Sequence, residues 1–193
     1  MRERQSSDWV IDLNGRHGIE AQVEHALSIH PTLTLLKAST TSFDRLDFQV
    51  LSAGEQLVQV ELKAKRQPLS KGWRDLRPEV RPEDLFVLDE LALRKIVDAG
   101  RYAFLLVRDI PQARWVLWSV GSLLVASRAR HARALDRGAG TRLKGKLLFD
   151  LSEAGFATTD LQAALDEVER TARLVDARWT DIAPWPTPLG ATG

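Results

Sequence analysis

Two carboxylates and a lysine, Asp47, Glu61 and Lys63, lie on either side of a turn centred on Gly54. If the chain forms a hairpin there, Asp47 lies opposite Glu61, because directly paired residues are equidistant from the turn. Directly opposed side chains stand roughly 5 Å apart. That spacing suits Mg²⁺ or Mn²⁺, which is commonly held by one or two carboxylates together with water and phosphate oxygens. The pattern predicts a divalent-metal site that acts on phosphate esters, with Lys63 facing it.

The strands that carry these groups alternate between apolar and polar residues. Side chains of a strand point to opposite faces in turn, so this alternation predicts one buried face and one charged, solvent-exposed face. The apolar face is expected to comprise Leu46, Phe48, Val50, Val58, Val60 and Leu62. Asp44 is the rival of Asp47 as a metal ligand, but it shares the parity of the apolar residues, and Asp47 is therefore favoured.

A helix is predicted over residues 16–30, upstream of the hairpin. Its apolar residues Ile19, Val23 and Leu27 recur at helical spacing and form one buried stripe. Glu20 and Glu24 flank that stripe on adjoining turns, so either carboxylate is able to face the metal site. Of the two, Glu20 is favoured as the additional catalytic and metal-binding carboxylate.

The spacing Asp-x(13)-Glu-x-Lys on a hairpin resembles the PD-(D/E)XK nuclease superfamily over residues 15–125. Among its members, the archaeal Holliday-junction resolvases are similar in compactness and in the order of elements. The residue before Asp47 is Leu46, where the family usually has proline. The resemblance implies an α/β fold with a restriction-endonuclease-like core of a helix, a three-stranded antiparallel run, a second helix and a further strand. It also implies a Mg²⁺-dependent endonuclease that cleaves DNA and forms a homodimer.

The rest of the chain is expected to complete and extend this core. Residues 32–37, 102–107 and 114–120 have strand composition, and a helical stripe from Leu88 to Ala99 ends at Gly100. We assign residues 1–127 to the core, 128–180 to an extension of the same domain and 181–193 to a disordered tail. The extension contains a basic loop and an amphipathic helix that runs through about residue 178. That helix is able either to pack on the sheet or to pair with its copy in a dimer.

Two basic segments are candidates for phosphate contact, since the formal net charge of +1 excludes binding by bulk charge. The first spans residues 128–146, where only Asp136 opposes seven cations, and its glycines are typical of a flexible loop and equally of turns. These cations are Arg128, Arg130, Arg133, Arg137, Arg142, Lys144 and Lys146. The alternative for this segment is an ordinary solvated loop.

The second basic segment spans residues 66–84, which contain three prolines and are therefore expected to lack regular structure over most of their length. It leaves directly from the strand that carries Lys63 and is placed to cover a substrate. Its candidate phosphate ligands, with one residue from the end of the strand, are Lys65, Arg66, Lys71 and Arg74. Trp73, within the segment, is expected either to stack on a base or to pack on the core.

Other functional classes lack support in the sequence. The 193 residues contain no cysteine, which excludes disulfides and cysteine-based zinc sites. No secretory signal is recognised and the longest apolar stretch is too short to span a bilayer, so the expected location is the cytoplasm, away from membranes. No phosphate-cradling glycine loop is present, and we expect no nucleotide cofactor. The remaining alternatives are a catalytically silent module that binds DNA or protein, and a subunit of a larger nucleic-acid-processing complex.

Overall fold

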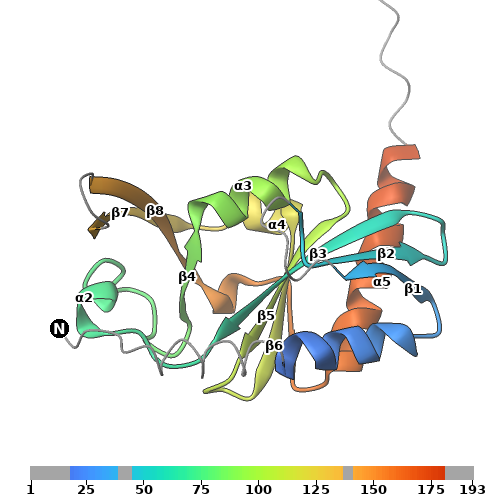
Figure 1. The fold of residues 1–193 in the computed structure, drawn as a ribbon, viewed down its shortest axis with the longest axis horizontal. Helices are drawn as coiled ribbons and strands as arrows, with labels where there is room; N and C mark the ends of the chain where they lie inside the picture. Colours follow the sequence, from blue (N-terminus) through green and yellow to red (C-terminus); the bar gives the residue numbers. More distant parts are fainter. Residues whose placement is uncertain (1–17, 39–44, 137–140, 181–193) are drawn as a thin grey trace, which may run out of the picture.

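The structure, a computed structural model, describes residues 18–38, 45–136 and 141–180; of residues 133–136, 141–144 and 176–180 it describes the backbone alone. The fold is mixed α/β and is built on a six-stranded mixed sheet (Figure 1). Its strands, in spatial order, are β1 (Leu33–Ala38), β2 (Phe48–Ser52), β3 (Leu57–Lys65), β5 (Ala103–Asp109), β6 (Arg114–Ser119) and β9 (Phe156–Thr158). Neighbouring strands are antiparallel except β3 and β5, which are parallel.

A second, three-stranded antiparallel sheet has the order β4 (Leu85–Asp89), β8 (Thr141–Asp150), β7 (Arg128–Asp136). This sheet corrects two predictions. The basic segment is a β-hairpin rather than a flexible loop, because Leu147, Leu148 and Phe149 are buried and anchor β8 beside β4. Leu88, expected in a helix, lies in β4, since the apolar run at 85–88 is buried as a strand.

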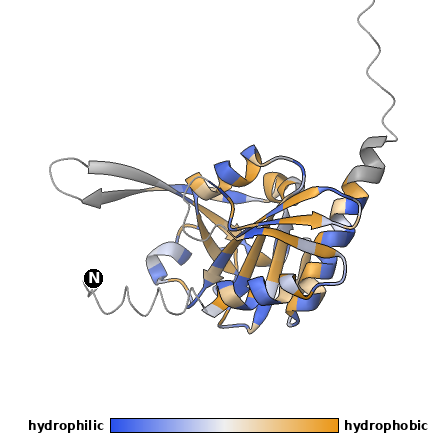
Figure 2. Cartoon of the chain, turned by 45° about the vertical axis from the view of Figure 1, so that its right-hand side comes forward, coloured by the Kyte–Doolittle hydropathy of each residue, from blue (hydrophilic) through white to orange (hydrophobic). Residues whose placement is uncertain are grey.

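Helices cover both faces of the large sheet, and the sheet separates the core into two layers (Figures 1 and 2). The helix over residues 18–28 and α5 (Leu161–Thr180) pack on one face through Val23, Leu27, Leu165 and Val168. The other face is covered by α3 (Glu90–Asp98), α4 (Val120–Val125) and the small sheet. Strand residues alternate between the two layers, as the pleat of a strand requires.

The C-terminal helix α5 packs back on the sheet of its own chain. Leu165, Val168 and Ala172 of its apolar stripe, together with Ala164, belong to the core that also contains Val23. The stripe is therefore used within the chain rather than left free to pair with a second copy. No helix in the described part of the chain is long and apolar enough to cross a membrane.

The segment that follows β3 is largely irregular, as its prolines predicted, and contains only the short helix α2 (Lys71–Arg74). The buried Arg77 guanidinium anchors it by donating to the carbonyl oxygens of Ser127 and Leu148, at 3.1 and 3.2 Å. Trp73 packs edge-on against His131 of β7, with 5.4 Å between ring centroids. A short 3-10 turn, η1 (Leu151–Glu153), connects β8 to β9.

The β2–β3 hairpin has the predicted register. Phe48 pairs with Val60 and Val50 with Val58, so the turn is centred on Gly54. The pairing stops at Phe48, and Leu46 departs from the prediction. Instead of joining Phe48 in one core layer, Leu46 packs in the other layer, with the residues of α3. The chain therefore enters the hairpin with a change of direction around Asp47.

Candidate functional site

The hairpin brings Asp47, Glu61 and Lys63 together. Asp47 directly precedes β2, where the pairing of that strand with β3 stops. The Lys63 ammonium donates to Glu61 Oε1, and its Nζ lies 3.9 Å from Asp47 Oδ2. Asp47 Oδ2 also accepts a hydrogen bond of 2.8 Å from the backbone N–H of Leu62. Two carboxylates from adjacent strands thus share one cation, and the backbone fixes the orientation of the first.

Burial of these groups differs from the expected open charged face. Only 4% of Asp47 and 1% of Glu61 are exposed, and Glu61 lies on the face of the sheet against which α3, α4 and the small sheet pack. The side chain of Lys63 is 29% exposed and connects the pair to solvent. The site is therefore a buried pair of carboxylates with a partly exposed ammonium at its edge.

A second lysine, Lys95 of α3, completes the site and escaped the sequence analysis. Its Nζ lies 3.6 Å from Glu61 Oε2, and it donates a hydrogen bond of 3.3 Å to the carbonyl oxygen of Arg45. Its side chain is 27% exposed. The sequence gives no distinct signal for Lys95, because α3 also carries the charged residues Glu90, Arg94 and Asp98, and the approach of α3 to β3 depends on the tertiary fold.

The donor set of the site fits a divalent cation. Asp47 and Glu61 supply carboxylate oxygens around a position that already attracts a cation, the Lys63 ammonium. Glu61 Oε2 is buried and has no hydrogen-bond partner, so it retains an unused acceptor. Two carboxylates suffice for Mg²⁺ or Mn²⁺, whose remaining positions are commonly filled by water and substrate oxygens.

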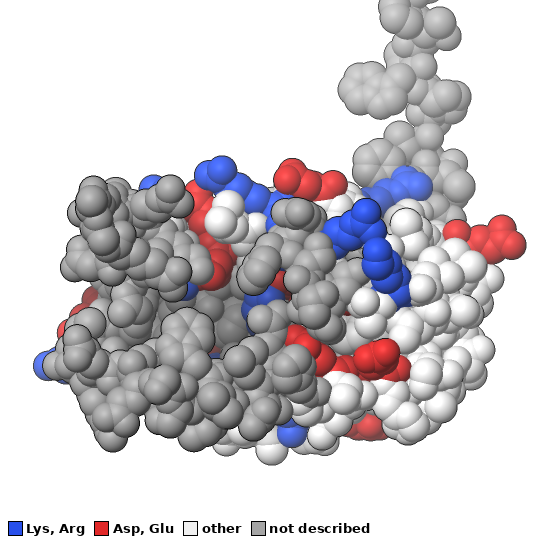
Figure 3. Space-filling view, in the orientation of Figure 1, with Lys and Arg blue, Asp and Glu red and all other residues white. Residues whose placement is uncertain are grey.

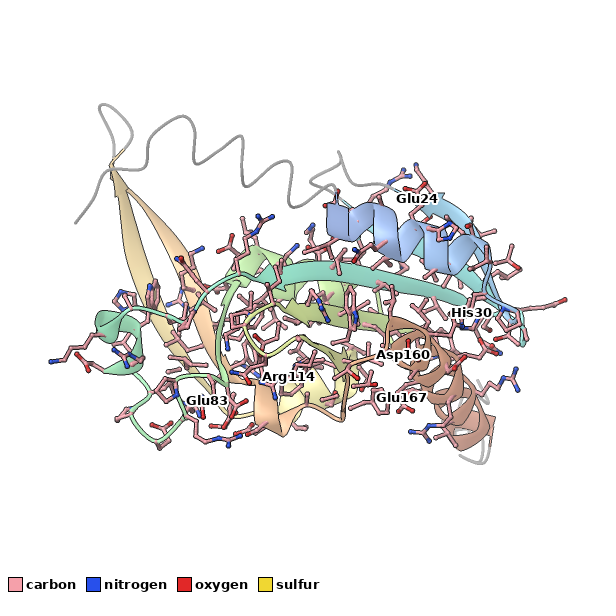
Figure 4. All side chains as sticks on the ribbon, turned by 90° about the horizontal axis from the view of Figure 1, so that it is seen from below. Glu24, His30, Glu83, Arg114, Asp160 and Glu167 are labelled. Carbon is pink, nitrogen blue, oxygen red and sulfur yellow. The ribbon has the colours of Figure 1, made fainter. Side chains whose placement is uncertain are left out.

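The two glutamates of the first helix differ in environment. Glu20 is buried and Glu24 is exposed, on the outer side of the helix (Figure 4). Within the described residues, no three Asp, Glu, His or Cys side chains lie close enough together to hold a metal ion. The structure therefore does not gather Glu20 or Glu24 with Asp47 and Glu61 into one ligand set.

A separate charged cluster lies at the C-terminal end of β3 and contains Lys65, Asp84, Asp109 and Arg114. Arg114 is labelled in Figure 4. Arg114 donates a hydrogen bond of 2.9 Å to Asp109 Oδ2 and one of 2.6 Å to Asp84 Oδ1. Lys65 Nζ lies 3.8 Å from Asp109 Oδ2. Burial on its own would raise the pKa of Asp84, but hydrogen bonds from Arg114 and Arg81 outweigh it and lower that pKa. We call these four residues the buried ion cluster.

Lys65 is thus not available to nucleic acid in this arrangement. Its side chain is 3% exposed, and its ammonium donates to the carbonyl oxygen of Glu83. Burial is the main reason that the pKa of Lys65 is lowered, with Asp109 acting in the opposite direction. The predicted phosphate contact does not fit this placement, because alternation along β3 gave the face of Lys65 but not the segment at 66–84 that covers it.

The described cations of the β7–β8 hairpin make intramolecular contacts. Arg128 donates to the Leu124 carbonyl at the end of α4, at 3.0 Å, and Lys146 pairs with Asp89. Arg130, which is 64% exposed, pairs with Glu90 at 3.0 Å. The side chains of Arg133, Arg142 and Lys144 lie outside the described residues, as does the whole of Arg137.

On the second basic segment, Lys71 and Arg74 of α2 are exposed, and Arg66 is half-buried. The contact of Trp73 with His131 attaches α2 to the base of the β7–β8 hairpin. Acidic and basic side chains alternate over the described part of the face in Figure 3, with no large area of one sign. We name Lys71, Arg74 and Arg130 the basic edge.

Comparisons of the chain with protein-family models, with curated proteins and with solved structures find no match.

Proposed function

We propose that this protein is a metal-dependent phosphodiesterase that cleaves DNA, and that its core is of the restriction-endonuclease-like type. The observation that carries the proposal is the convergence of Asp47 and Glu61 on the Lys63 ammonium. Buried carboxylates that share a cation are able to exchange that ammonium for a divalent ion. The unused oxygen of Glu61 supports this exchange.

The order of elements supports the proposed type of fold. A helix at 18–28 precedes the antiparallel strands β1, β2 and β3, and α3 and the parallel strand β5 follow. This is the order that the resemblance to PD-(D/E)XK nucleases implies. Strand β4 is an addition to that order, because it leads into α3 but belongs to the small sheet.

The residues of the site have distinct roles in the proposed reaction. Asp47 and Glu61 would hold one divalent ion, which supplies an acidified water and offsets charge at phosphorus. The Leu62 N–H keeps Asp47 oriented for that task. Lys63 would either orient the attacking water or stabilise the negative charge that develops on the phosphate. Glu20 is left out of the direct ligand set.

DNA is the proposed substrate because of the basic edge. Lys71 and Arg74 lie on α2, which is attached to β7 by the packing of Trp73 on His131, and Arg130 lies beside His131 in β7 but points to the other face of that strand. Exposed lysine and arginine contact phosphates without reading sequence, and each contact makes binding more sensitive to salt. Arg66 and the arginines farther along the β7–β8 hairpin are proposed to extend this contact.

The test is cleavage of supercoiled plasmid, a four-way junction and single-stranded DNA, each with Mg²⁺, Mn²⁺ or chelator. We expect metal-dependent cleavage of at least one substrate by the wild-type protein and none by Asp47→Ala or Glu61→Ala. Circular dichroism and thermal unfolding of each variant serve as the control for folding. Cleavage that survives in both folded variants would reject the site.

A catalytically silent binding module is the second candidate, and one observation favours it. Glu61 faces two lysines, Lys63 and Lys95, which neutralise the pair of carboxylates without a metal. Such a module would bind DNA with the same affinity in Mg²⁺ and in chelator and would leave every substrate intact. The cleavage assay combined with a binding assay therefore separates the two candidates.

A further inference from the structure

Lys95 of α3 lies beside the buried carboxylate of Glu61. Its ammonium sits beside the one oxygen of Glu61 that lacks a hydrogen-bond partner, while Lys63 holds the other oxygen. Lys95 Nζ is 3.6 Å from that oxygen, beyond the distance of a hydrogen bond. The ammonium therefore neutralises Glu61 by charge without using its lone pairs.

The attachment of Lys95 is also weak enough to be released. Its hydrogen bond to the Arg45 carbonyl is long, at 3.3 Å, and 27% of its side chain is exposed. Glu61 itself is buried, so the ammonium is able to turn outward only when another cation, such as the divalent ion, takes over the charge of that carboxylate. The flexible four-carbon stem of lysine allows this movement while α3 stays in place.

We infer that Lys95 is a placeholder cation that yields Glu61 to the divalent ion and then contacts a phosphate of the DNA. This inference rests on the proposed function, because it needs a metal at Asp47 and Glu61. It adds a second substrate-contacting cation, supplied by α3 rather than by the hairpin. The site then has Lys63 on the strand and Lys95 on the helix, both partly exposed at its edge.

Two opposite effects distinguish this role from a structural one. Removing the ammonium removes a competitor for Glu61, so Lys95→Gln is expected to bind Mn²⁺ roughly two- to fivefold more tightly, as the loss of a weak ion pair implies. The same variant loses a phosphate contact, so its affinity for a DNA duplex in Mn²⁺ is expected to fall several-fold. A lysine that only supported the fold would leave the duplex affinity of the folded variant unchanged.

The experiment measures Mn²⁺ binding by calorimetry and duplex binding by fluorescence anisotropy on the full chain. Arg94→Gln is the matched control, since Arg94 is the exposed neighbour of Lys95 on α3 and pairs with Glu90 instead. We expect no change in that variant. Lys95→Arg, which keeps the charge, is expected to retain most of the DNA affinity.

Glu61→Gln separates failure of this inference from failure of the proposed function. If Glu61→Gln abolishes Mn²⁺ binding but Lys95→Gln binds Mn²⁺ no more tightly than the wild type, the metal site stands and the placeholder role is overturned. Unchanged duplex affinity in a folded Lys95→Gln overturns the phosphate contact in the same way. Mn²⁺ binding that is absent, or indifferent to Glu61→Gln, rejects the metal site and the inference together.

Discussion

Two charged clusters lie on the same face of β3 and have different characters. The site around Glu61 holds its carboxylates with two lysines that are each more than a quarter exposed. The buried ion cluster contains Arg114, which bridges Asp84 and Asp109 with two hydrogen bonds while Lys65 is almost wholly enclosed. Arginine fits carboxylates at fixed geometry, whereas lysine is a mobile point charge. We therefore expect the first cluster to be the one able to exchange its cations and the second to keep them.

Stability should depend far more on the buried ion cluster. Arg114→Ala leaves two buried carboxylates without their main partner and is expected to cost about 3–5 kcal/mol of the free energy of unfolding. Urea denaturation measures the loss. Arg94→Ala, which removes an exposed ion pair, is the control and should unfold close to the wild type. Equal losses in both variants would remove the distinction between the clusters.

Glu61→Gln should show the reverse behaviour. We expect cleavage to fall at least about a hundredfold, because a metal ligand is lost. The free energy of unfolding should change by less than about 1 kcal/mol, since both lysines are able to turn to solvent. The two quantities are measured on one preparation by plasmid cleavage and urea denaturation. A loss of stability as large as that of Arg114→Ala would assign Glu61 to the framework of the fold.

Lys63 and Lys65, two residues apart on β3, allow the sharpest comparison. Lys63→Ala should lower turnover roughly tenfold more than it lowers DNA affinity, because its charge is needed chiefly in the transition state. Lys65→Ala should act mainly through the midpoint of thermal unfolding, as Asp109 loses a buried partner. Single-turnover kinetics and anisotropy give the first pair of values. Equal loss of turnover and affinity in Lys63→Ala would make that lysine a simple phosphate contact.

Lowering the pH should remove the stabilisation that Asp84 gives to the buried ion cluster. Burial raises the pKa of Asp84, but the hydrogen bonds from Arg114 and Arg81 lower it below its usual value. A carboxylate with a lowered folded-state pKa stabilises the fold above its unfolded pKa of about 3.9, and this contribution disappears as pH falls through the folded value. Wild type should therefore exceed Asp84→Asn in stability by a constant amount above about pH 5. The gap should close as pH falls below the unfolded pKa and through the lowered pKa of folded Asp84, as followed by urea midpoints. A gap independent of pH would show that Asp84 acts through shape alone.

The smallest expected effect concerns Arg130 of the basic edge together with Arg133 farther along β7. Replacing Arg130 and Arg133 together by alanine should weaken binding to all DNA sequences about equally and reduce the slope of log affinity against log salt by roughly one to two units. Arg130 first has to leave Glu90, so its share of this effect is the smaller one. Anisotropy titrations at several salt concentrations measure the slope. An unchanged slope would leave Lys71 and Arg74 as the phosphate contacts.

The sequence predicted those elements whose local residue pattern matches the way they are buried in the fold. The register of β2 and β3 followed from alternation about Gly54, and the pairing of Phe48 with Val60 confirmed it. Gly100, expected to end a helix, adopts a left-handed φ of 88° just after α3. Such positions are predictable because one residue or one short period determines the conformation.

The errors arise where distant segments determine the outcome. The seven cations and the glycines of residues 128–146 favoured a loop, but pairing with β4, some 60 residues away in the chain, makes β8 a strand. The contact of Lys95 with Glu61 likewise depends on how α3 crosses the sheet. Burial of Asp47 and Glu61 was missed for the same reason, since alternation gives the face of a strand but not what covers it.

The pairing of Leu85 with Asp150 in the small sheet has a consequence for how the chain folds. The β2–β3 hairpin closes a short loop and is able to form as soon as both strands have been synthesised. Strand β4 lacks its partner until β8 emerges from the ribosome, and such long-range pairing is slow. Because β4 continues directly into α3, we expect Lys95 to reach its place only after that late pairing. Nascent chains would therefore hold Asp47, Glu61 and Lys63 together before the helix that covers them has docked.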